Sequence, residues 1–190
     1  MRVLVACEFS GRVRQAFRNA GHDAWSCDLF EDSEDGSPFH VRADAVEMAN
    51  SQPCDLMVAH PPCTHLAVSG ARHFDEKRRD GRQQAALDFV RSLMDAPVER
   101  IAVENPVSII STAIRRPDQI IHPWQFGHGE TKATCLWLKG LPKLTPTKMV
   151  EGRSPATHRM PESADRWKNR SRTYAGIAQA MADQWGKNES

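Results

Sequence analysis

Short apolar runs alternate with amphipathic segments through the first half of the chain. The apolar runs are rich in β-branched residues and bounded by turn-forming residues, as buried strands are, and they cover residues 2–7, 23–27, 55–60 and 100–103. The segments with apolar residues at helical spacing cover residues 13–20, 41–49 and 75–94. Gly21, directly after the first of these segments, is typical of a helix C-terminus. This alternation predicts an α/β fold with a mainly parallel sheet that is covered on both faces.

The second half of the chain is less regular. We predict a strand over residues 134–138, a basic stretch interrupted by prolines over 141–172, and a final helix over 174–185. No internal repeat and no clear linker divides the sequence. The chain is therefore predicted to form a single domain over residues 1–190.

Composition narrows the class of protein. The 190 residues are 40% hydrophobic and 26% charged, which is typical of one compact folded domain. Lysine plus arginine (25) and aspartate plus glutamate (24) nearly cancel, so any contact with nucleic acid must be local rather than driven by a global positive field. No apolar run approaches the roughly 20 residues of a membrane span, and no leader pattern follows Met1. We therefore expect a cytoplasmic protein that does not interact with membranes.

The five cysteines are an odd number, widely spaced and without a C-x-x-C pair. This pattern favours free thiols over disulfide bonds or a zinc site. The histidines also lack the spacing of zinc ligands, and we expect no metal ion. A free thiol is available for nucleophilic chemistry.

Two of the predicted strands lead into residues with catalytic potential, at the edge of the sheet where ligands of parallel sheets bind. The first leads into Pro61-Pro62-Cys63, where two prolines fix the backbone and hold the thiol in one orientation. A thiolate suits attack on an electron-poor ring carbon. The second leads into Glu104-Asn105-Pro106, which we predict as another loop. Taken singly, a buried structural cysteine and a solvated or helix-capping glutamate remain the alternatives.

In this order the two segments resemble the catalytic motifs of the cytosine-C5 DNA methyltransferases. The resemblance implies that Cys63 adds to C6 of cytosine and that Glu104 binds the N3 and exocyclic amino edge, where it stabilises protonation at N3. It also implies S-adenosylmethionine as the cofactor and the three-layer, Rossmann-like fold of the methyltransferases that use it. Contacts to the substrate are implied for Pro62, Thr64 and Asn105.

Three further segments carry the resemblance. Phe9-Ser10-Gly11 is similar to the family's cofactor-binding Phe-x-Gly loop, although an ordinary βα turn is the alternative. Residues 174–181 resemble the family's last motif, which folds back beside the cofactor, and residues 132–138 resemble a block of its short phage-type members. Asp28, at the end of the second strand, is placed to bind ribose hydroxyls, and Asp44 is expected near the adenine. The cofactor-binding residues so implied are Phe9, Ser10, Gly11, Asp28, Asp44 and Pro61.

The sequence also departs from the family's pattern. A glycine, a glutamine and a valine of its motifs are replaced by His60, Thr64 and Pro106, and its Gln-x-Arg-x-Arg signature is absent. An irregular basic segment over residues 139–173 stands in place of a target-recognition domain. Within this segment, Arg170 and Arg172 are expected to bind the base or its phosphate, with a solvated basic loop as the alternative.

The leading hypothesis is a DNA (cytosine-5-)-methyltransferase-like enzyme that acts on a flipped or single-stranded cytosine in DNA. The first alternative is an enzyme that modifies a free cytosine nucleotide or single-stranded nucleic acid, or that depends on a protein partner or a second copy of itself for targeting. The second is a non-catalytic module of the same fold that binds nucleic acid or a host protein. Methylation of an amino group is disfavoured, because those enzymes place an aromatic residue at the position of Cys63.

Overall fold

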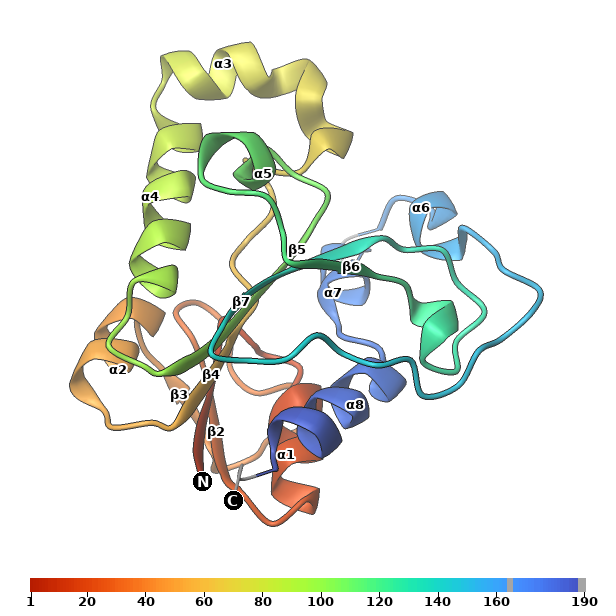
Figure 1. Ribbon diagram of the computed structural model, residues 1–190. Helices are drawn as coiled ribbons and strands as arrows, with labels where there is room; N and C mark the ends of the chain where they lie inside the picture. The colour runs from red at the N-terminus through yellow and green to blue at the C-terminus, as the bar shows by residue number, and fades with distance from the viewer. Residues whose placement is uncertain (164–165, 188–190) are drawn as a thin grey trace.

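A seven-stranded sheet forms the middle layer of the computed structural model, which describes residues 1–163 and 166–187. The strands lie in the order β3-β2-β1-β4-β5-β7-β6 (Figure 1). Their bounds are β1 (Arg2–Ala6), β2 (Asp23–Asp28), β3 (His40–Arg42), β4 (Leu56–Ala59), β5 (Arg100–Pro106), β6 (Gln119–Ile121) and β7 (Thr134–Lys139). The first five in this order are parallel, whereas β7 runs antiparallel to both β5 and β6. The predicted mainly parallel sheet is confirmed.

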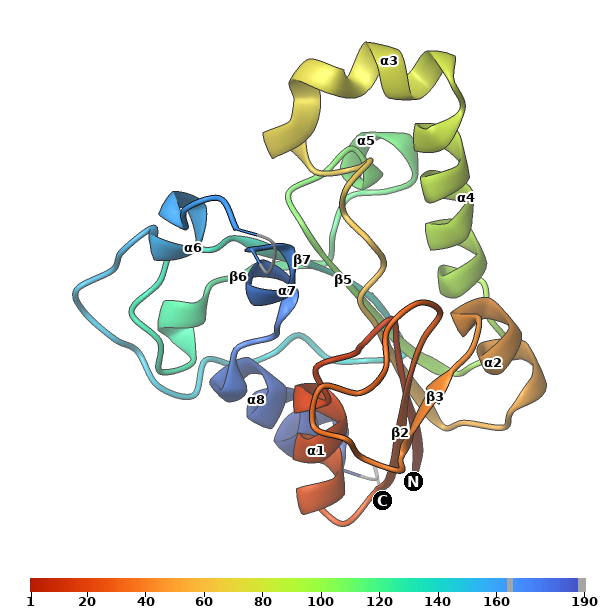
Figure 2. The ribbon, with the colours of Figure 1, turned by 180° about the vertical axis from the view of Figure 1, so that it is seen from behind.

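Helices cover both faces of the sheet, so the molecule has the predicted three layers (Figures 1 and 2). The four main helices are α1 (Arg12–Asn19), α2 (Ala45–Ser51), α4 (Arg82–Met94) and α8 (Ala175–Trp185). α1 and α8 pack on one face, against Val3 and Val5 of β1. α2 and α4 pack on the other face, against Leu4 and Ala6. Because its side chains are buried on both faces, β1 is a continuous apolar run rather than an alternating one.

Short helices lie in the connections. They are η1 (Val68–His73), α3 (Phe74–Arg79), α5 (Ile110–Ala113), η2 (Pro123–Gln125), α6 (Ala156–Arg159) and α7 (Arg166–Ser171). η1 and α3 connect β4 to α4, whereas α6 and α7 precede α8 within the segment predicted as irregular and basic. Each helix in the described ranges falls short, in length or in apolar character, of what a membrane span needs.

The first helix ends as its sequence predicts. Gly21 adopts a left-handed conformation with φ of 86°. Its N–H donates to the Arg18 carbonyl at 2.9 Å, and the next N–H, of His22, donates to the Phe17 carbonyl at 3.0 Å. These two bonds form a Schellman motif, which satisfies carbonyls that the helix leaves unpaired. The chain then turns directly into β2, so the opening βαβ unit is confirmed.

Two helix predictions are wrong in part. The predicted helix over 41–49 starts too early, because its first residues form β3 and α2 begins only after Asp44, which caps it. The predicted helix over 75–94 is two helices, because Gly81 between them has φ of 82° and interrupts the helical path. The short edge strand β6 has no counterpart among the predicted elements.

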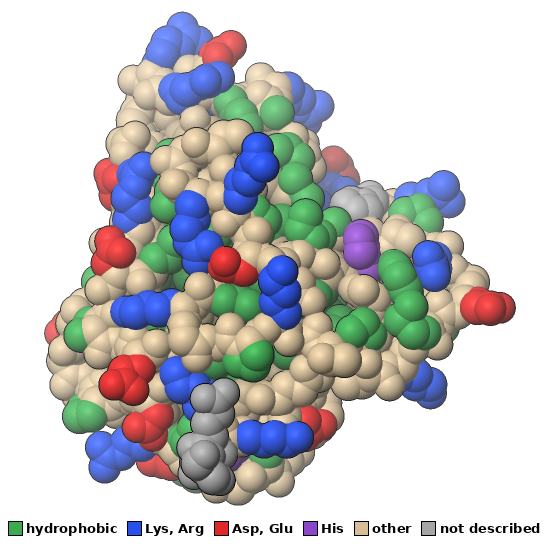
Figure 3. Space-filling view, viewed as in Figure 1, with side chains coloured by type: hydrophobic (Ala, Val, Ile, Leu, Met, Phe, Trp, Pro, Cys, Tyr) green, Lys and Arg blue, Asp and Glu red, His purple; other side chains and the backbone are tan. Residues whose placement is uncertain are grey.

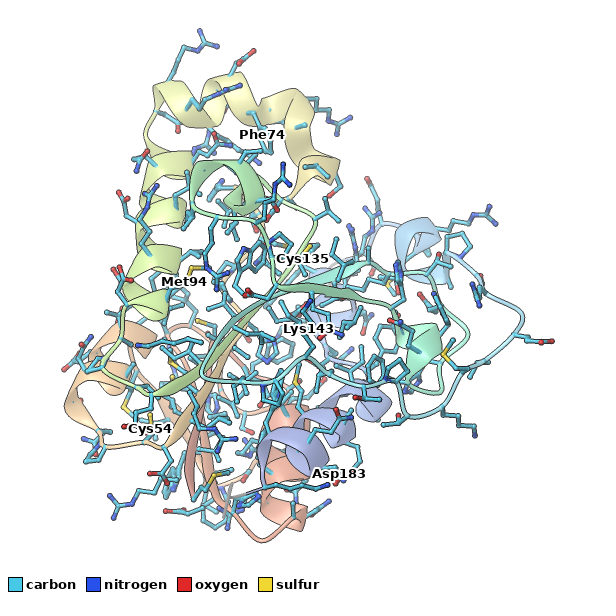
Figure 4. All side chains as sticks on the ribbon, viewed as in Figure 1. Cys54, Phe74, Met94, Cys135, Lys143 and Asp183 are labelled. Atoms are coloured by element: carbon cyan, nitrogen blue, oxygen red, sulfur yellow. The ribbon has the colours of Figure 1, made fainter. Side chains whose placement is uncertain are left out.

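The predicted loop at residues 104–106 is also wrong. Glu104, Asn105 and Pro106 continue β5, where they pair with Leu136, Cys135 and Thr134 of β7. β5 extends beyond the end of its other neighbour, β4, because the antiparallel strand β7 continues to pair with it. Figure 4 places Cys135 where β5, β6 and β7 meet. Glu104 therefore projects from a rigid strand rather than from a loop.

α8 closes one face of the sheet by packing against α1. Its last residue, Trp185, is 0% exposed, and its indole Nε1 donates to the Pro142 carbonyl at 2.9 Å. Arg100, at the start of β5, donates to the Trp185 carbonyl. Asp183 lies on the solvent side of the same helix (Figure 4). Trp185 thus joins the C-terminal helix to the rest of the fold, through its indole and its backbone carbonyl.

We expect Trp185→Ala to lower the free energy of unfolding by about 3–5 kcal/mol, because it removes a fully buried indole and leaves a cavity. Trp167→Ala is the matched control, since Trp167 is 51% exposed and should cost less than half as much. Urea unfolding followed by far-ultraviolet circular dichroism measures both values. Equal losses in the two variants would contradict the anchoring role of Trp185.

Candidate active site

The loop after β4 is held by hydrogen bonds to both neighbouring strands. The His60 N–H donates to the Ala6 carbonyl at 2.9 Å, next to the end of β1. Asn105 of β5 is buried, and its Nδ2 donates to the Pro61 carbonyl at 2.8 Å. The Cys63 carbonyl accepts the N–H groups three and four residues further on, at 3.0 and 2.9 Å. The thiol therefore lies at the beginning of a fixed turn.

Glu104 forms a buried pair with a histidine. His60 Nδ1 lies 2.9 Å from Glu104 Oε2, and the two side chains are only 9% and 14% exposed. Burial disfavours the charged form of each group, but their hydrogen bond and mutual charge outweigh it. The pKa of His60 is therefore raised and the pKa of Glu104 is lowered. This arrangement favours an imidazolium–carboxylate pair beside the thiol.

The structure brings Cys63 and Glu104 together, as the two motifs predict. Cys63 reaches the surface, yet desolvation by the surrounding protein raises the pKa of its thiol, and the charge of Glu104 raises it further. The positive charges of Lys132 and Arg170 lower that pKa, and the net shift is upward. The site thus holds a neutral thiol with two cations close enough to favour its ionisation.

Lys132 connects this site to α7. Its Nζ donates to the Arg170 carbonyl at 2.7 Å, near the end of that helix. Its charge also lowers the pKa of Glu104, although burial and His60 have larger effects on that group. Of the two arginines predicted to bind substrate, Arg170 thus lies near Cys63. Arg172 instead forms an ion pair with Glu34 in the connection after β2.

The predicted Phe-x-Gly loop lies between β1 and α1. The buried Glu8 carboxylate accepts the N–H of Val13 at 2.7 Å and the N–H of Arg14 at 3.2 Å, and so it caps α1. The Ser10 hydroxyl donates to the same carboxylate at 3.3 Å. Gly11 has φ of 68°, and a Cβ there would collide with the Arg14 guanidinium. The left-handed backbone and the buried Arg14 side chain therefore favour glycine at this position without any bound ligand.

Asp28 and Asp44 lie close together beyond the ends of β2 and β3. Each uses Oδ1 to accept N–H groups of its own turn, at 2.8 to 3.1 Å. Burial raises the pKa of the Cys7 thiol, and nearby acidic groups that include both aspartates raise it further. Leu29 and Phe30, next to Asp28, are 48% and 77% exposed. Carboxylates and apolar side chains thus share one surface.

α7 packs over the first loop. The Trp167 and Phe9 ring centroids are 5.7 Å apart, and Lys168 Nζ lies 5.6 Å from the centroid of the Phe9 ring. Lys168 also pairs with Glu31 at 2.8 Å. The last third of the chain therefore covers part of the predicted cofactor-binding loop.

Two predicted substrate-binding residues flank the thiol at the surface. Pro62 and Thr64 are both exposed, and the Thr64 carbonyl accepts a hydrogen bond from Lys77 Nζ at 2.6 Å. Asn105, in contrast, is buried and holds the loop through Pro61. The Cys63 thiol therefore lies at the surface, on a loop that Asn105 holds in place.

Sequence reasoning missed the roles of His60, Lys132 and Glu8. His60 stands out in the sequence only as a replacement of a glycine, although its place directly before the two prolines at a strand end is a usable signal. Lys132 precedes the predicted strand 134–138, and nothing local in the sequence indicates that it reaches Cys63. In the described part of the chain, no three His, Cys, Asp or Glu residues gather as metal ligands, and the five cysteines are free thiols.

Comparison with known proteins bears on the fold. No protein-family model matches the sequence, and no curated protein sequence does. The structure is similar to a candidate DNA modification methyltransferase encoded within an E. coli prophage, with a TM-score of 0.51 and 15% identity, over 79% of this chain and 52% of that one. It is also similar to the Entamoeba histolytica methyltransferase EhMeth, with a TM-score of 0.54 and 16% identity, over 86% of this chain and 61% of that one.

The chain spans 52% and 61% of the lengths of these two proteins. At 15% and 16% identity the likeness is one of fold. The chain therefore has the Rossmann-like fold of methyltransferases, as the resemblance of its motifs implies.

Proposed function

We propose that this protein transfers a methyl group from S-adenosylmethionine to C5 of cytosine in DNA. The observation that carries the proposal is the meeting of Cys63 and Glu104, from the ends of the paired strands β4 and β5, with Lys132 acting on both. The reaction needs a nucleophile for C6 and an acid–base group for the N3 edge. Cys63 and Glu104 supply them.

The loops after β1, β2 and β3 fit a nucleoside-type cofactor. Asp28 and Asp44 each keep Oδ2 without a partner among the described residues, which suits ribose hydroxyls and the adenine amino group. Leu29 and Phe30 offer exposed apolar surface to a purine ring. S-adenosylmethionine bound there supplies an electrophilic methyl group. Residues 9–11 and Pro61 complete the proposed contacts to it.

Cys63 activates the base. Its thiolate adds to C6, the electrons of the C5–C6 double bond move toward N3, and C5 becomes an enamine-like nucleophile. Once C5 carries the methyl group, the C5 proton passes to water and the N3 proton returns to Glu104, which re-forms the C5–C6 double bond and expels the thiolate. Lys132 and Arg170 assist both steps, because they lower the pKa of the thiol.

His60 positions Glu104 and supplies the proton that N3 gains. The hydrogen bond of 2.9 Å from His60 Nδ1 fixes the Glu104 carboxylate, and the imidazolium holds a proton next to it. As electrons reach N3, this proton passes through Glu104 to the base, and the charge that develops there is neutralised. His60 is thus a positioning residue that acts through Glu104.

DNA binding by this protein must rest on a local surface. On the face shown in Figure 3, basic side chains are dispersed among acidic ones, in keeping with a formal net charge of +1. A free cytosine nucleotide or single-stranded nucleic acid remains the alternative substrate, and a partner protein or second copy the alternative route to targeting. Turnover of dCMP but not of DNA would establish the free nucleotide.

Expression in cells that lack cytosine methylation tests the proposal. We expect 5-methylcytosine in DNA digests from cells with the wild-type protein, and at least about a hundredfold less with Cys63→Ala. Cys54→Ala is the matched control and should retain activity, because Cys54 precedes β4 at the opposite edge of the sheet. Mass spectrometry of nucleosides measures the product. Equal product from Cys63→Ala, or N4-methylcytosine or N6-methyladenine instead, would refute the assignment. No product on DNA or on dCMP from a protein that still binds nucleic acid would favour the non-catalytic module.

Lys132 should control the reactivity of Cys63. We expect Lys132→Met to raise the pKa of the thiol and to slow its alkylation by iodoacetamide at pH 8 by about two- to tenfold, since a tenfold change corresponds to one pKa unit. Lys143→Met is the control, because Lys143 is exposed and is not among the charges that act on Cys63. Mass spectrometry of the Cys63 peptide measures the rates. Identical rates in the two variants would show that Lys132 does not act on the thiol.

The buried pair makes a prediction about pH. We expect the His60 pKa to lie above its usual value of 6.5 in the wild-type protein, and below it in Glu104→Gln, where burial and the charge of Lys132 lower it and only the smaller effect of Glu8 raises it. Side-chain NMR titration measures it, with His65 as the control whose pKa burial already lowers. An unchanged His60 pKa in Glu104→Gln would contradict the pairing.

The same pair should affect stability. The raised His60 pKa contributes stability that is fully present below pH 6.5 and is lost as the pH rises through the folded value. The lowered Glu104 pKa contributes stability that is present above pH 4.5 and is lost as the pH falls through its folded value. The contribution of the pair to the free energy of unfolding is therefore greatest between pH 4.5 and pH 6.5.

A further inference from the structure

A groove lined by three arginines lies between η1 and α7. Its volume is about 400 Å³, within the range of small-ligand pockets. Val68, Ser69, Ala71 and Arg72 form one wall, and Arg166 and Arg170 form the other. We call this feature the arginine groove.

Among the described residues, the arginine groove has no acidic side chain in its lining to balance its positive charge. Within the part of the chain that the structure describes, the carboxylate paired with Arg166 is that of the 96% exposed Glu162, at 3.8 Å, and the buried Arg166 Nε has no hydrogen-bond partner. Arg72 Nε donates to the ring Nε2 of His73 at 2.9 Å rather than to a carboxylate. Guanidinium groups placed together in this way favour a bound anion over water.

Both walls of the groove are tied to the catalytic residues. η1 begins one turn after Cys63, whose carbonyl anchors that turn, and the Val68 N–H donates to the Val107 carbonyl at 3.1 Å just past β5. On the other side, Lys132 holds α7 through the Arg170 carbonyl at 2.7 Å. Arg170 lines the groove and also lowers the pKa of Cys63. The groove therefore shares Arg170 with the surroundings of the thiol.

We propose that the arginine groove binds the phosphate attached to the sugar of the target cytosine and so selects nucleotides over nucleosides. This inference rests on the proposed function for the identity of the base, whereas the recognition of phosphate rests on the groove alone. A guanidinium fork matches phosphate oxygens in pairs. The apolar Val68 and Ala71 line the same groove and offer contact to a sugar. The phosphate belongs either to a DNA strand or to a free nucleotide.

Binding of unmodified probes to the full chain tests the groove without turnover. We expect dCMP to bind at least tenfold more tightly than deoxycytidine in calorimetric titrations, because charge-assisted hydrogen bonds add to the affinity. The double substitution Arg72→Gln, Arg166→Gln should remove that preference and leave deoxycytidine binding unchanged. The matched control is Arg78→Gln, Arg79→Gln, which removes the same charge from the exposed helix α3 and should change binding less than twofold.

A single-stranded twelve-nucleotide DNA with one cytosine identifies the source of the phosphate. If this DNA competes more tightly than dCMP, and the groove variant weakens it at least tenfold, the phosphate belongs to a strand. If dCMP binds at least as tightly, the free nucleotide is the ligand. Three outcomes would overturn the proposal. The first is equal binding of dCMP and deoxycytidine together with DNA binding that the groove variant does not weaken. The others are no binding of any probe, and equal losses of binding in the groove and control variants. A phosphate preference without any 5-methylcytosine formation would refute the proposed reaction and leave the groove assignment intact.

Discussion

The hydrogen bond from Asn105 Nδ2 to the Pro61 carbonyl is the contact on which the site depends. It joins the ends of β4 and β5, and these strands lead to the proposed nucleophile Cys63 and carry the Glu104 carboxylate. Loss of such a buried bond leaves two polar groups without partners, at a cost of about 1–3 kcal/mol. It would also leave the Cys63 turn without its link to the strand that carries Glu104. The rigidity of β5 beyond β4, which β7 provides, is what makes the bond possible.

Opposed charges set the resting state of the site. His60 keeps Glu104 ionised in spite of burial, and that carboxylate in turn raises the pKa of Cys63. Lys132 and Arg170 act against it from the last third of the chain. A thiol held neutral in this way resists oxidation and alkylation, since both require the thiolate.

The local sequence predicts the parts of the fold that local chemistry decides. The strands 2–7 and 134–138, the Schellman glycine Gly21 and the final helix follow from periodicity and turn chemistry, and all are present. The extension of β5 through residues 104–106 could not be predicted, because it depends on a partner strand some thirty residues further on. The proximity of Cys63 and Glu104 could be predicted from the order of the two motifs that contain them. The roles of His60 and Lys132 depend on tertiary contacts, which no spacing in the sequence records.

The position of Lys132, α7 and α8 along the chain has a consequence for biosynthesis. β1 and the loop with Cys63 leave the ribosome first, whereas the cations that tune the thiol and the helix that packs on α1 come from the final third. A nascent chain therefore displays its cysteine and one open face of the sheet before these later segments are made. Synthesis of α7 and α8 is the step that brings the cations and the covering helix into place, so a product that stops before them has an exposed apolar sheet.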